Sequence, residues 1–215
     1  MKRIVMGVTG ASGACYARRL ARCLAEHDIE LHLVVSPAAR RVMEGELDLR
    51  EFSLDILLGR LARNVILHPH DDVGACIASG SFLTSGMVIC PCSSHSLAAI
   101  ANGLGDNLIT RAAMVTLKEA RKLILVPREM PLSQIEIENM LTLSRAGAII
   151  CPACPGFYTK PKTIDGVIDF VVGRVLDLLG FPHTLTARWD PSAQRVASPD
   201  VPAGDCGEGD ASDRR

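Results

Sequence analysis

The sequence predicts an α/β protein with a doubly wound parallel sheet in a single domain. Short runs of apolar residues alternate along the chain with stretches of helical periodicity. Strands that are apolar throughout are typical of a parallel sheet covered by helices on both faces. The 215 residues, 48% of them hydrophobic, are enough to bury one such domain and few for two.

The first element is a predicted strand over residues 4–8, which leads into the loop Thr9-Gly-Ala-Ser-Gly13 and a helix over 14–26. A strand, a glycine loop and a helix in this order direct backbone N–H groups at an anion, commonly a nucleotide or flavin phosphate. The glycines follow G-x-x-G-x-x-G, which differs from the dinucleotide fingerprint. A tight turn without a ligand therefore stays open, as does a simple N-cap role for Ser12.

The remaining elements follow the same logic. Residues 30–35 alternate and then become apolar, which predicts a strand before a helix over 38–44. Helical periodicity predicts further helices, and short apolar runs predict further strands. The predicted helices cover residues 52–63, 97–102, 108–122, 133–145 and 164–179, and the predicted strands cover residues 87–90, 123–126 and 148–151. From residue 190 onward the chain is polar and rich in Pro and Gly, which predicts a disordered tail after a domain of residues 1–189.

Composition argues against several classes of function. A net charge of −1 and an aromatic content of 4% give no support for binding nucleic acid or a membrane surface. No apolar run has the length of a membrane span, and the first residues lead into a strand rather than a signal peptide. We therefore expect a cytoplasmic protein whose 8 cysteines are thiols.

The ends of the predicted strands indicate where a ligand would bind, because doubly wound sheets bind ligands at the carboxyl ends of their strands. Ser36 ends the second strand, where nicotinamide enzymes usually carry an acid, although a plain turn serine remains an alternative. Tyr158 and Lys162 match the spacing of the short-chain dehydrogenase pair, but Pro161 disfavours the helix that this pair requires. The polar loop of residues 91–96 can share a ligand with the first loop, or serve only as an N-cap cluster.

Charged residues near one strand suggest phosphate chemistry. Arg128 and Glu129 directly follow the strand at 123–126, and Lys118 precedes it on a helix. Two cations beside an acid fit the binding of a phosphate ester and protonation of its leaving oxygen. A solvated surface role stays open for each of these charges.

Two groups of residues resemble metal sites. Cys90 and Cys92 together with Cys151 and Cys154 could supply four thiolates, but prolines and the packing of small thiols at strand ends favour a structural role. The segment His68-Pro-His-Asp-Asp72 is favoured as a turn.

In the order and spacing of its motifs, the chain resembles the flavin prenyltransferases, the UbiX family, and their phenolic-acid-decarboxylase relatives. The resemblance covers about residues 2 to 189. The motifs that carry it are Gly7-Val-Thr-Gly-Ala-Ser-Gly13, Ala78-Ser-Gly-Ser-Phe82, Pro91-Cys-Ser93, Arg111-Ala-Ala-Met-Val-Thr-Leu-Lys-Glu119, Leu125-Val-Pro-Arg-Glu-Met-Pro-Leu132, Glu138-Asn-Met140, Pro155-Gly-Phe-Tyr158, Arg174-Val-Leu-Asp177 and Arg188-Trp189.

The resemblance implies a flavodoxin-like, Rossmann-like fold and a homo-oligomer, most simply a dodecamer. It also implies transfer of a dimethylallyl group from dimethylallyl monophosphate to N5 and C6 of reduced FMN. The prenylated FMN would serve a UbiD-type decarboxylase as cofactor, and the family requires no metal.

Site roles follow from the resemblance position by position. Residues implied to surround the flavin are Gly10, Ala11, Ser12, Ser36, Ser93, Ser94, His95, Ser96 and Arg128, with Ser12 near N5. Residues implied to bind the prenyl phosphate are Arg111, Lys118, Arg128, Tyr158 and Arg174. Glu44 would assist deprotonation of N5, Glu129 would protonate the departing phosphate, and Trp189 would lie over the allyl cation. Some of these residues would come from neighbouring subunits.

The chain departs from the family pattern at Met114, at His95-Ser96 and at Glu136, which puts the details of flavin binding in doubt. Three alternatives remain: an FMN-dependent cysteine-decarboxylase-type flavoprotein, a nicotinamide reductase and a non-catalytic flavin carrier. The first would need an early catalytic His and an Asn in the third loop, and the chain has neither there.

Overall fold

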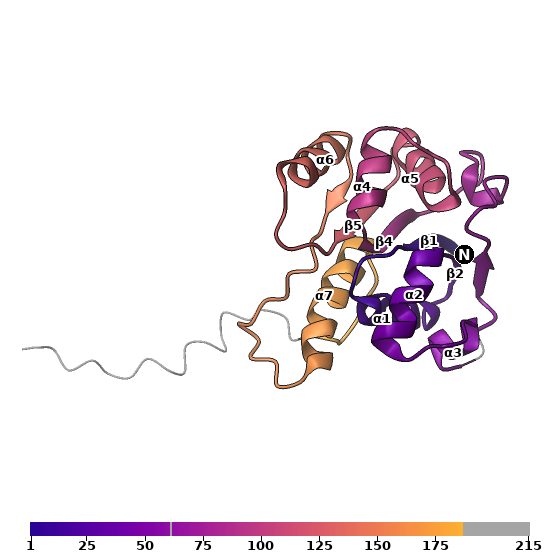
Figure 1. Cartoon of the computed structure of the whole chain (residues 1–215). Coiled ribbons are helices and arrows are strands. Elements are labelled where there is room, and N and C mark those ends of the chain that lie inside the picture. Colours follow the sequence, from indigo (N-terminus) through magenta and orange to yellow (C-terminus); the bar gives the residue numbers. More distant parts are fainter. Residues whose placement is uncertain (61, 187–215) are drawn as a thin grey trace, which may run out of the picture.

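The computed structural model describes residues 1–60 and 62–186, which form one domain around a parallel sheet (Figure 1). Within these residues the six strands lie in the order β3-β2-β1-β4-β5-β6. The strands are β1 Lys2–Val8, β2 Ile29–Val35, β3 Val65–His68, β4 Gly86–Cys92, β5 Leu123–Pro127 and β6 Ile149–Ile150. Without the edge strand β3 the order is that of a flavodoxin-like sheet, and it reverses between β1 and β4. The predicted doubly wound α/β fold is confirmed.

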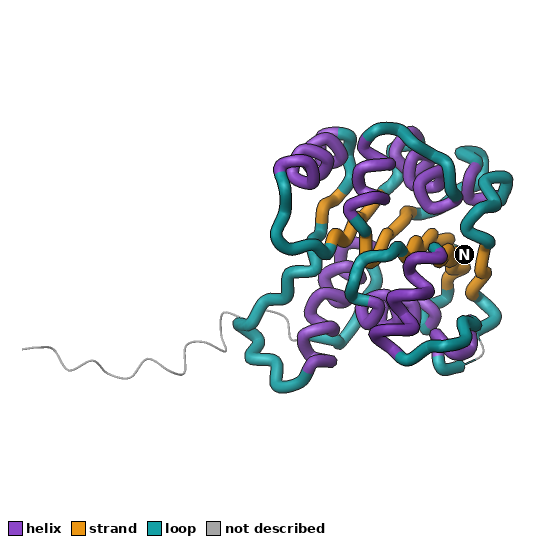
Figure 2. The backbone as a smooth tube through the Cα atoms, viewed as in Figure 1, coloured by secondary structure: helices purple, strands orange, loops and turns teal. Residues whose placement is uncertain are grey.

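Helices cover both faces of the sheet (Figure 2). One core packs between the sheet and the helices α1 Ala14–Ala25, α2 Pro37–Leu47, α3 Leu54–Leu58 and α7 Ile164–Leu179. The other core packs against the short 3₁₀ helix η1 Cys76–Ala78 and the helices α4 Ser94–Ala101, α5 Leu108–Lys118 and α6 Gln134–Arg145. Because both faces are covered, the residues of β4, and those of β1 from Ile4 onward, are buried regardless of the side to which they point.

Three predictions about individual elements were wrong. The strand β3 was missed, because a four-residue edge strand with one neighbour carries a short pattern. Helix α3 covers only part of the helix predicted over residues 52–63, because Gly59 ends it in a left-handed conformation with φ 71°. Helix α5 ends at Lys118 rather than at 122, because Ala120 takes a left-handed conformation with φ 52° and the Arg121 N–H turns back to the Thr116 carbonyl.

Within the described part of the chain, no helix combines the length and the apolar character required to cross a bilayer. The predictions for Trp189 and for a disordered tail from residue 190 fall outside the described residues.

Candidate functional site

Three helices begin around one cavity at the carboxyl edge of the sheet. Ser36 caps α2 by accepting a hydrogen bond from the Ala39 N–H at 3.0 Å. Ser93 caps α4, and the side-chain Oδ1 of Asn107 caps α5 by accepting from two backbone N–H groups. The cavity, which we call the three-helix cavity, has a volume of about 420 Å³. It is lined by Thr9, Gly10, Ser36, Pro37, Ala38, Arg41, His70, Ser93, His95, Ser96 and Asn107. The positive ends of three helix dipoles and one guanidinium therefore surround a single space.

A buried threonine holds the first loop against the junction of β4 and α4, where the structure has strand and helix in place of the predicted loop of residues 91–96. The Thr9 hydroxyl donates to the Pro91 carbonyl at 2.8 Å and accepts from the Ser93 N–H at 2.7 Å. Gly10 approaches α2 so closely that an added Cβ would lie 2.6 Å from the Ala38 Cβ. The first loop and the junction therefore form one wall of the cavity, and Gly10 has no room for a side chain.

The N-terminus of α1 binds an anion that belongs to the protein itself. Gly13 N–H and Ala14 N–H donate to the Glu46 carboxylate at 2.9 and 2.8 Å. Burial raises the pKa of Glu46, but hydrogen bonds from Ser12, Gly13 and Ala14, together with the Arg128 charge, hold that pKa below its usual range. The sequence predicts a ligand at this end of the loop, and the family resemblance implies the acidic role for Glu44. In the structure both glutamates are exposed residues of α2, and Glu46 is the one bonded to the loop.

A second, mainly apolar cavity of about 480 Å³ adjoins the first loop at the ends of β5 and β6. It is lined by Pro127, Arg128, Glu129, Met130, Leu132, Met140, Pro152, Ala153 and Cys154, and we call it the apolar cavity. Arg128 Nε donates to the Ser12 carbonyl at 3.1 Å, and the Ser94 hydroxyl donates to Glu129 Oε2 at 3.4 Å. Arg128 and Glu129 therefore stand between the apolar cavity and the loops of the three-helix cavity.

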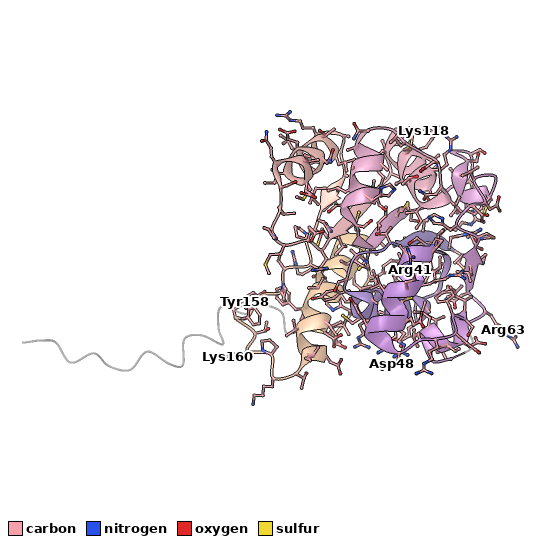
Figure 3. The ribbon with its side chains drawn as sticks, in the orientation of Figure 1. Arg41, Asp48, Arg63, Lys118, Tyr158 and Lys160 are labelled. Atoms are coloured by element: carbon pink, nitrogen blue, oxygen red, sulfur yellow. The ribbon has the colours of Figure 1, made fainter. Side chains whose placement is uncertain are left out.

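The other predicted phosphate ligands do not meet within one chain. Lys118 ends α5 near the start of β5, at the amino edge of the sheet, and pairs with Glu119 at 3.0 Å. Tyr158 is 66% exposed and packs edge-on against Phe170, on the opposite side of the molecule from Lys118 (Figure 3). Arg174 is exposed on α7 and lies 3.4 Å from Asp177. Arg111 is exposed in the first turn of α5.

Sequence spacing suggested two other sites, the dehydrogenase pair and a metal site of four cysteines. Residues 151–163 contain no helix, so Tyr158 and Lys162 do not form the dehydrogenase pair. The four cysteines near the ends of β4 and β6 form no metal-ligand group in the described residues. The segment after β3 is a turn, as predicted, closed by a bond from the Asp72 N–H to the Pro69 carbonyl at 3.3 Å.

Comparison with known proteins identifies the family. The Flavoprotein family profile matches residues 1–176. "Flavin prenyltransferase UbiX" of Thermoplasma acidophilum is 49% identical over 187 residues, which cover 87% of this chain and 99% of that protein. The chain belongs to the flavin prenyltransferase family.

Solved structures agree with this assignment. AnUbiX (PadA1), crystallised with FMN and dimethylallyl pyrophosphate, superposes with a TM-score of 0.81 at 41% identity, over 88% of this chain and 97% of that one. A dodecameric FMN-dependent UbiX-like decarboxylase from Escherichia coli O157:H7 gives a TM-score of 0.80 at 45% identity, over 87% and 99%. The cysteine decarboxylase TvaF, at 17% identity and a TM-score of 0.57, shares the fold alone. The flavin prenyltransferase assignment is thus favoured over the cysteine-decarboxylase alternative.

Proposed function

We propose that the enzyme transfers the dimethylallyl group of dimethylallyl monophosphate to N5 and C6 of reduced FMN. The observation that carries the proposal is the three-helix cavity beside the apolar cavity, with Arg128 and Glu129 between them. A phosphate dianion suits the first cavity, and a five-carbon chain suits the second. The relative AnUbiX was crystallised with both kinds of molecule.

The donor set of the three-helix cavity fits FMN. Ser36, Ser93 and Asn107 present the N-termini of three helices to one space, and Arg41 adds a cation, which is the chemistry that holds a phosphate. Residues assigned to the rest of the flavin are Gly10, Ala11, Ser12, Ser94, His95 and Ser96. When bound, reduced FMN supplies the nucleophilic N5 and C6 atoms.

Arg128 and Glu129 are assigned to the leaving phosphate. The Arg128 guanidinium holds its oxygens, and the Glu129 carboxyl donates a proton to the bridging oxygen as the carbon–oxygen bond breaks. The apolar cavity keeps water from the allylic carbon, which disfavours hydrolysis of the dimethylallyl group.

We assign to Glu46 the role that the family resemblance implied for Glu44. Its carboxylate is held ionised by the first turn of α1 and is bonded to the Ser12 side chain. The Ser12 hydroxyl can therefore pass the N5 proton to Glu46, which accepts it at a carboxylate oxygen.

Lys118, Tyr158 and Arg174, with Arg111 nearby, complete the phosphate site from neighbouring copies of the chain. This assignment requires a homo-oligomer, which the E. coli relative forms as a dodecamer. Co-expression of two inactive variants, Lys118→Met and Glu129→Gln, tests it. Random mixing at a heterologous interface would make roughly a quarter of the sites intact. Activity restored only in the mixture supports the shared site, and no restoration contradicts it.

The prenylated FMN would be consumed by a UbiD-type decarboxylase. The seven described cysteines are all free thiols, which agrees with a cytoplasmic location.

Anaerobic incubation with reduced FMN and dimethylallyl monophosphate, followed by mass spectrometry of the released flavin, tests the reaction. A flavin heavier by one five-carbon unit supports transfer, and unmodified flavin contradicts it. Parallel incubation with the diphosphate tests the preference for the monophosphate. Glu129→Gln separates an enzyme, which slows by about 10²–10⁴-fold, from a flavin carrier, which would be unaffected.

A further inference from the structure

Two histidines and a cysteine gather at the outer edge of the sheet. His32 lies in β2 and His68 ends β3, and the parallel register opposes Val34 to His68. His32 and His68 therefore stand on the same face of the sheet. One ring nitrogen of each histidine and the sulfur of Cys76, at the start of η1, all lie within 4.8 Å of one another. None of the three lines the three-helix cavity or the apolar cavity.

The surroundings of His32 leave one ring nitrogen directed at the cluster. His32 is 2% exposed, and its Nε2 lies 2.7 Å from Glu30 Oε1, which Arg3 also contacts at 3.1 Å. A carboxylate accepts hydrogen bonds, so Nε2 carries the hydrogen and Nδ1 keeps its lone pair. Nδ1 lies 2.9 Å from His68 Nε2. A carboxylate behind a histidine whose other nitrogen faces a second histidine and a thiol is the arrangement of a metal-ligating histidine.

We propose that His32, His68 and Cys76 bind one zinc-class divalent ion, with Glu30 as the positioning residue behind His32. Two imidazoles and one thiolate suit Zn²⁺ in preference to the harder Mg²⁺ or Ca²⁺. Tetrahedral coordination requires the two nitrogens to be about 3.3 Å apart and nitrogen and sulfur about 3.6 Å apart. The His32–His68 pair would therefore open slightly on binding. The hydrogen on His68 Nε2 would move to its Nδ1, and the Cys76 thiol would release its proton to solvent. Cys76 is exposed, which leaves the fourth position to water.

The ion would fix a segment that reaches the three-helix cavity. His68 and Cys76 bracket residues 69–75, and His70 in this segment lines that cavity. The His70 carbonyl also accepts a hydrogen bond from the Leu108 N–H at 2.9 Å, at the start of α5. The site is thus structural, and it does not depend on the proposed reaction.

The test uses the full chain, reduced and stripped of metal with a chelator, and titrated with Co²⁺ and then Zn²⁺. We expect one equivalent of Co²⁺ to bind with a thiolate-to-metal charge-transfer band, and one equivalent of Zn²⁺ to displace it. Cys76→Ser should abolish the band, whereas Cys154→Ser, which also removes an exposed thiol, should keep it. Glu30→Gln should weaken Zn²⁺ binding by about 10–100-fold, and His68→Gln should weaken it more.

Circular dichroism of Cys76→Ser establishes that its fold is retained, which its exposed position leads us to expect. The chelator should lower the Tm of the wild-type chain and leave the Tm of Cys76→Ser unchanged. The proposal is overturned if no saturable equivalent binds. It is also overturned if the charge-transfer band survives in Cys76→Ser, or if Cys154→Ser removes it equally.

Discussion

Replacing Glu46 by Gln should destabilise the protein, with Glu44→Gln as a matched control on the same helix. The Glu46 carboxylate accepts from the Gly13 and Ala14 N–H groups at 2.9 and 2.8 Å. A glutamine keeps one carbonyl oxygen and turns an NH₂ group toward the other donor, so at least one N–H loses its acceptor. The loss amounts to about 1–2 kcal/mol after allowance for partial exposure.

For a chain of this size that loss corresponds to a fall in Tm of about 2–8 °C. The assay is thermal unfolding at one protein concentration, from pH 7 down to pH 3.5. The folded-state pKa of Glu46 lies below its unfolded value of about 4.3, so the ionised carboxylate stabilises the fold above that pH. This stabilisation is lost as the pH falls through the folded-state pKa. The Tm difference between wild type and Glu46→Gln should therefore be full at pH 7 and shrink below about pH 4.

Activity gives the second readout. Glu46→Gln should retain FMN and lose prenyl transfer, while Glu44→Gln should keep both Tm and activity. Equal behaviour of the two variants, or a Tm difference that does not change with pH, would refute the reasoning about Glu46.

Three further predictions follow from buried contacts. Thr9→Val leaves two backbone groups at the β4–α4 junction without their partner. The free energy of unfolding, measured with denaturant, should fall by about 2–4 kcal/mol, and FMN binding should weaken. An unchanged unfolding midpoint would contradict the role of Thr9. Gly10→Ala places a methyl group 2.6 Å from the Ala38 Cβ. The free energy of unfolding should therefore fall by about 1–3 kcal/mol, and the variant should retain less FMN on gel filtration. A variant that matches wild type in both would show that the loop has room for a side chain. Burial raises the pKa of Cys92 to about 12. An alkylating reagent at pH 8 should therefore modify exposed Cys154 and spare Cys92 until the protein unfolds. Labelling of Cys92 in the folded protein, detected by peptide mapping, would contradict its burial.

The sheet could be predicted because its central strands are buried on both faces and therefore read as apolar runs. β3 escaped prediction because it lies at the edge, where Ile66 is 41% exposed and only β2 supplies a partner. The loop residues Ser36 and Ser93 were predicted from their places after strands. The N-cap alternative for residues 91–96 is observed at Ser93. Ser36, for which a turn serine was the alternative, also caps a helix. Both serines line the three-helix cavity as well.

The identity of the acid on the first loop depended on a contact that local patterns do not encode. Glu46 meets Gly13 across 33 residues of sequence. Two positions along a helix differ by about 200° in direction. Glu44 and Glu46 therefore point to different sides of α2, and Glu46 is the one that contacts the first loop. Glu46 stands one residue before the end of α2, so the sequence does carry an acid there. Its contact with the first loop depends on the packing of α2 against α1, which the sequence pattern does not show.

The four helices α1, α2, α4 and α5 begin near the same edge of the sheet, and each would attract an anion there. Glu46 occupies the N-terminus of α1, which removes one of these four ends from competition for a ligand. The three remaining helix N-termini share one cavity, so a single phosphate placed there would be bound by all of them. The end of the flavin away from its phosphate would extend toward Ser12 and Glu46. The same carboxylate that fills the α1 terminus thereby becomes a base at the position where the proposed reaction needs one. Removing the Glu46 charge should also leave the α1 terminus free to bind a competing anion. Inorganic phosphate should therefore inhibit prenyl transfer by Glu46→Gln more strongly than it inhibits the wild type.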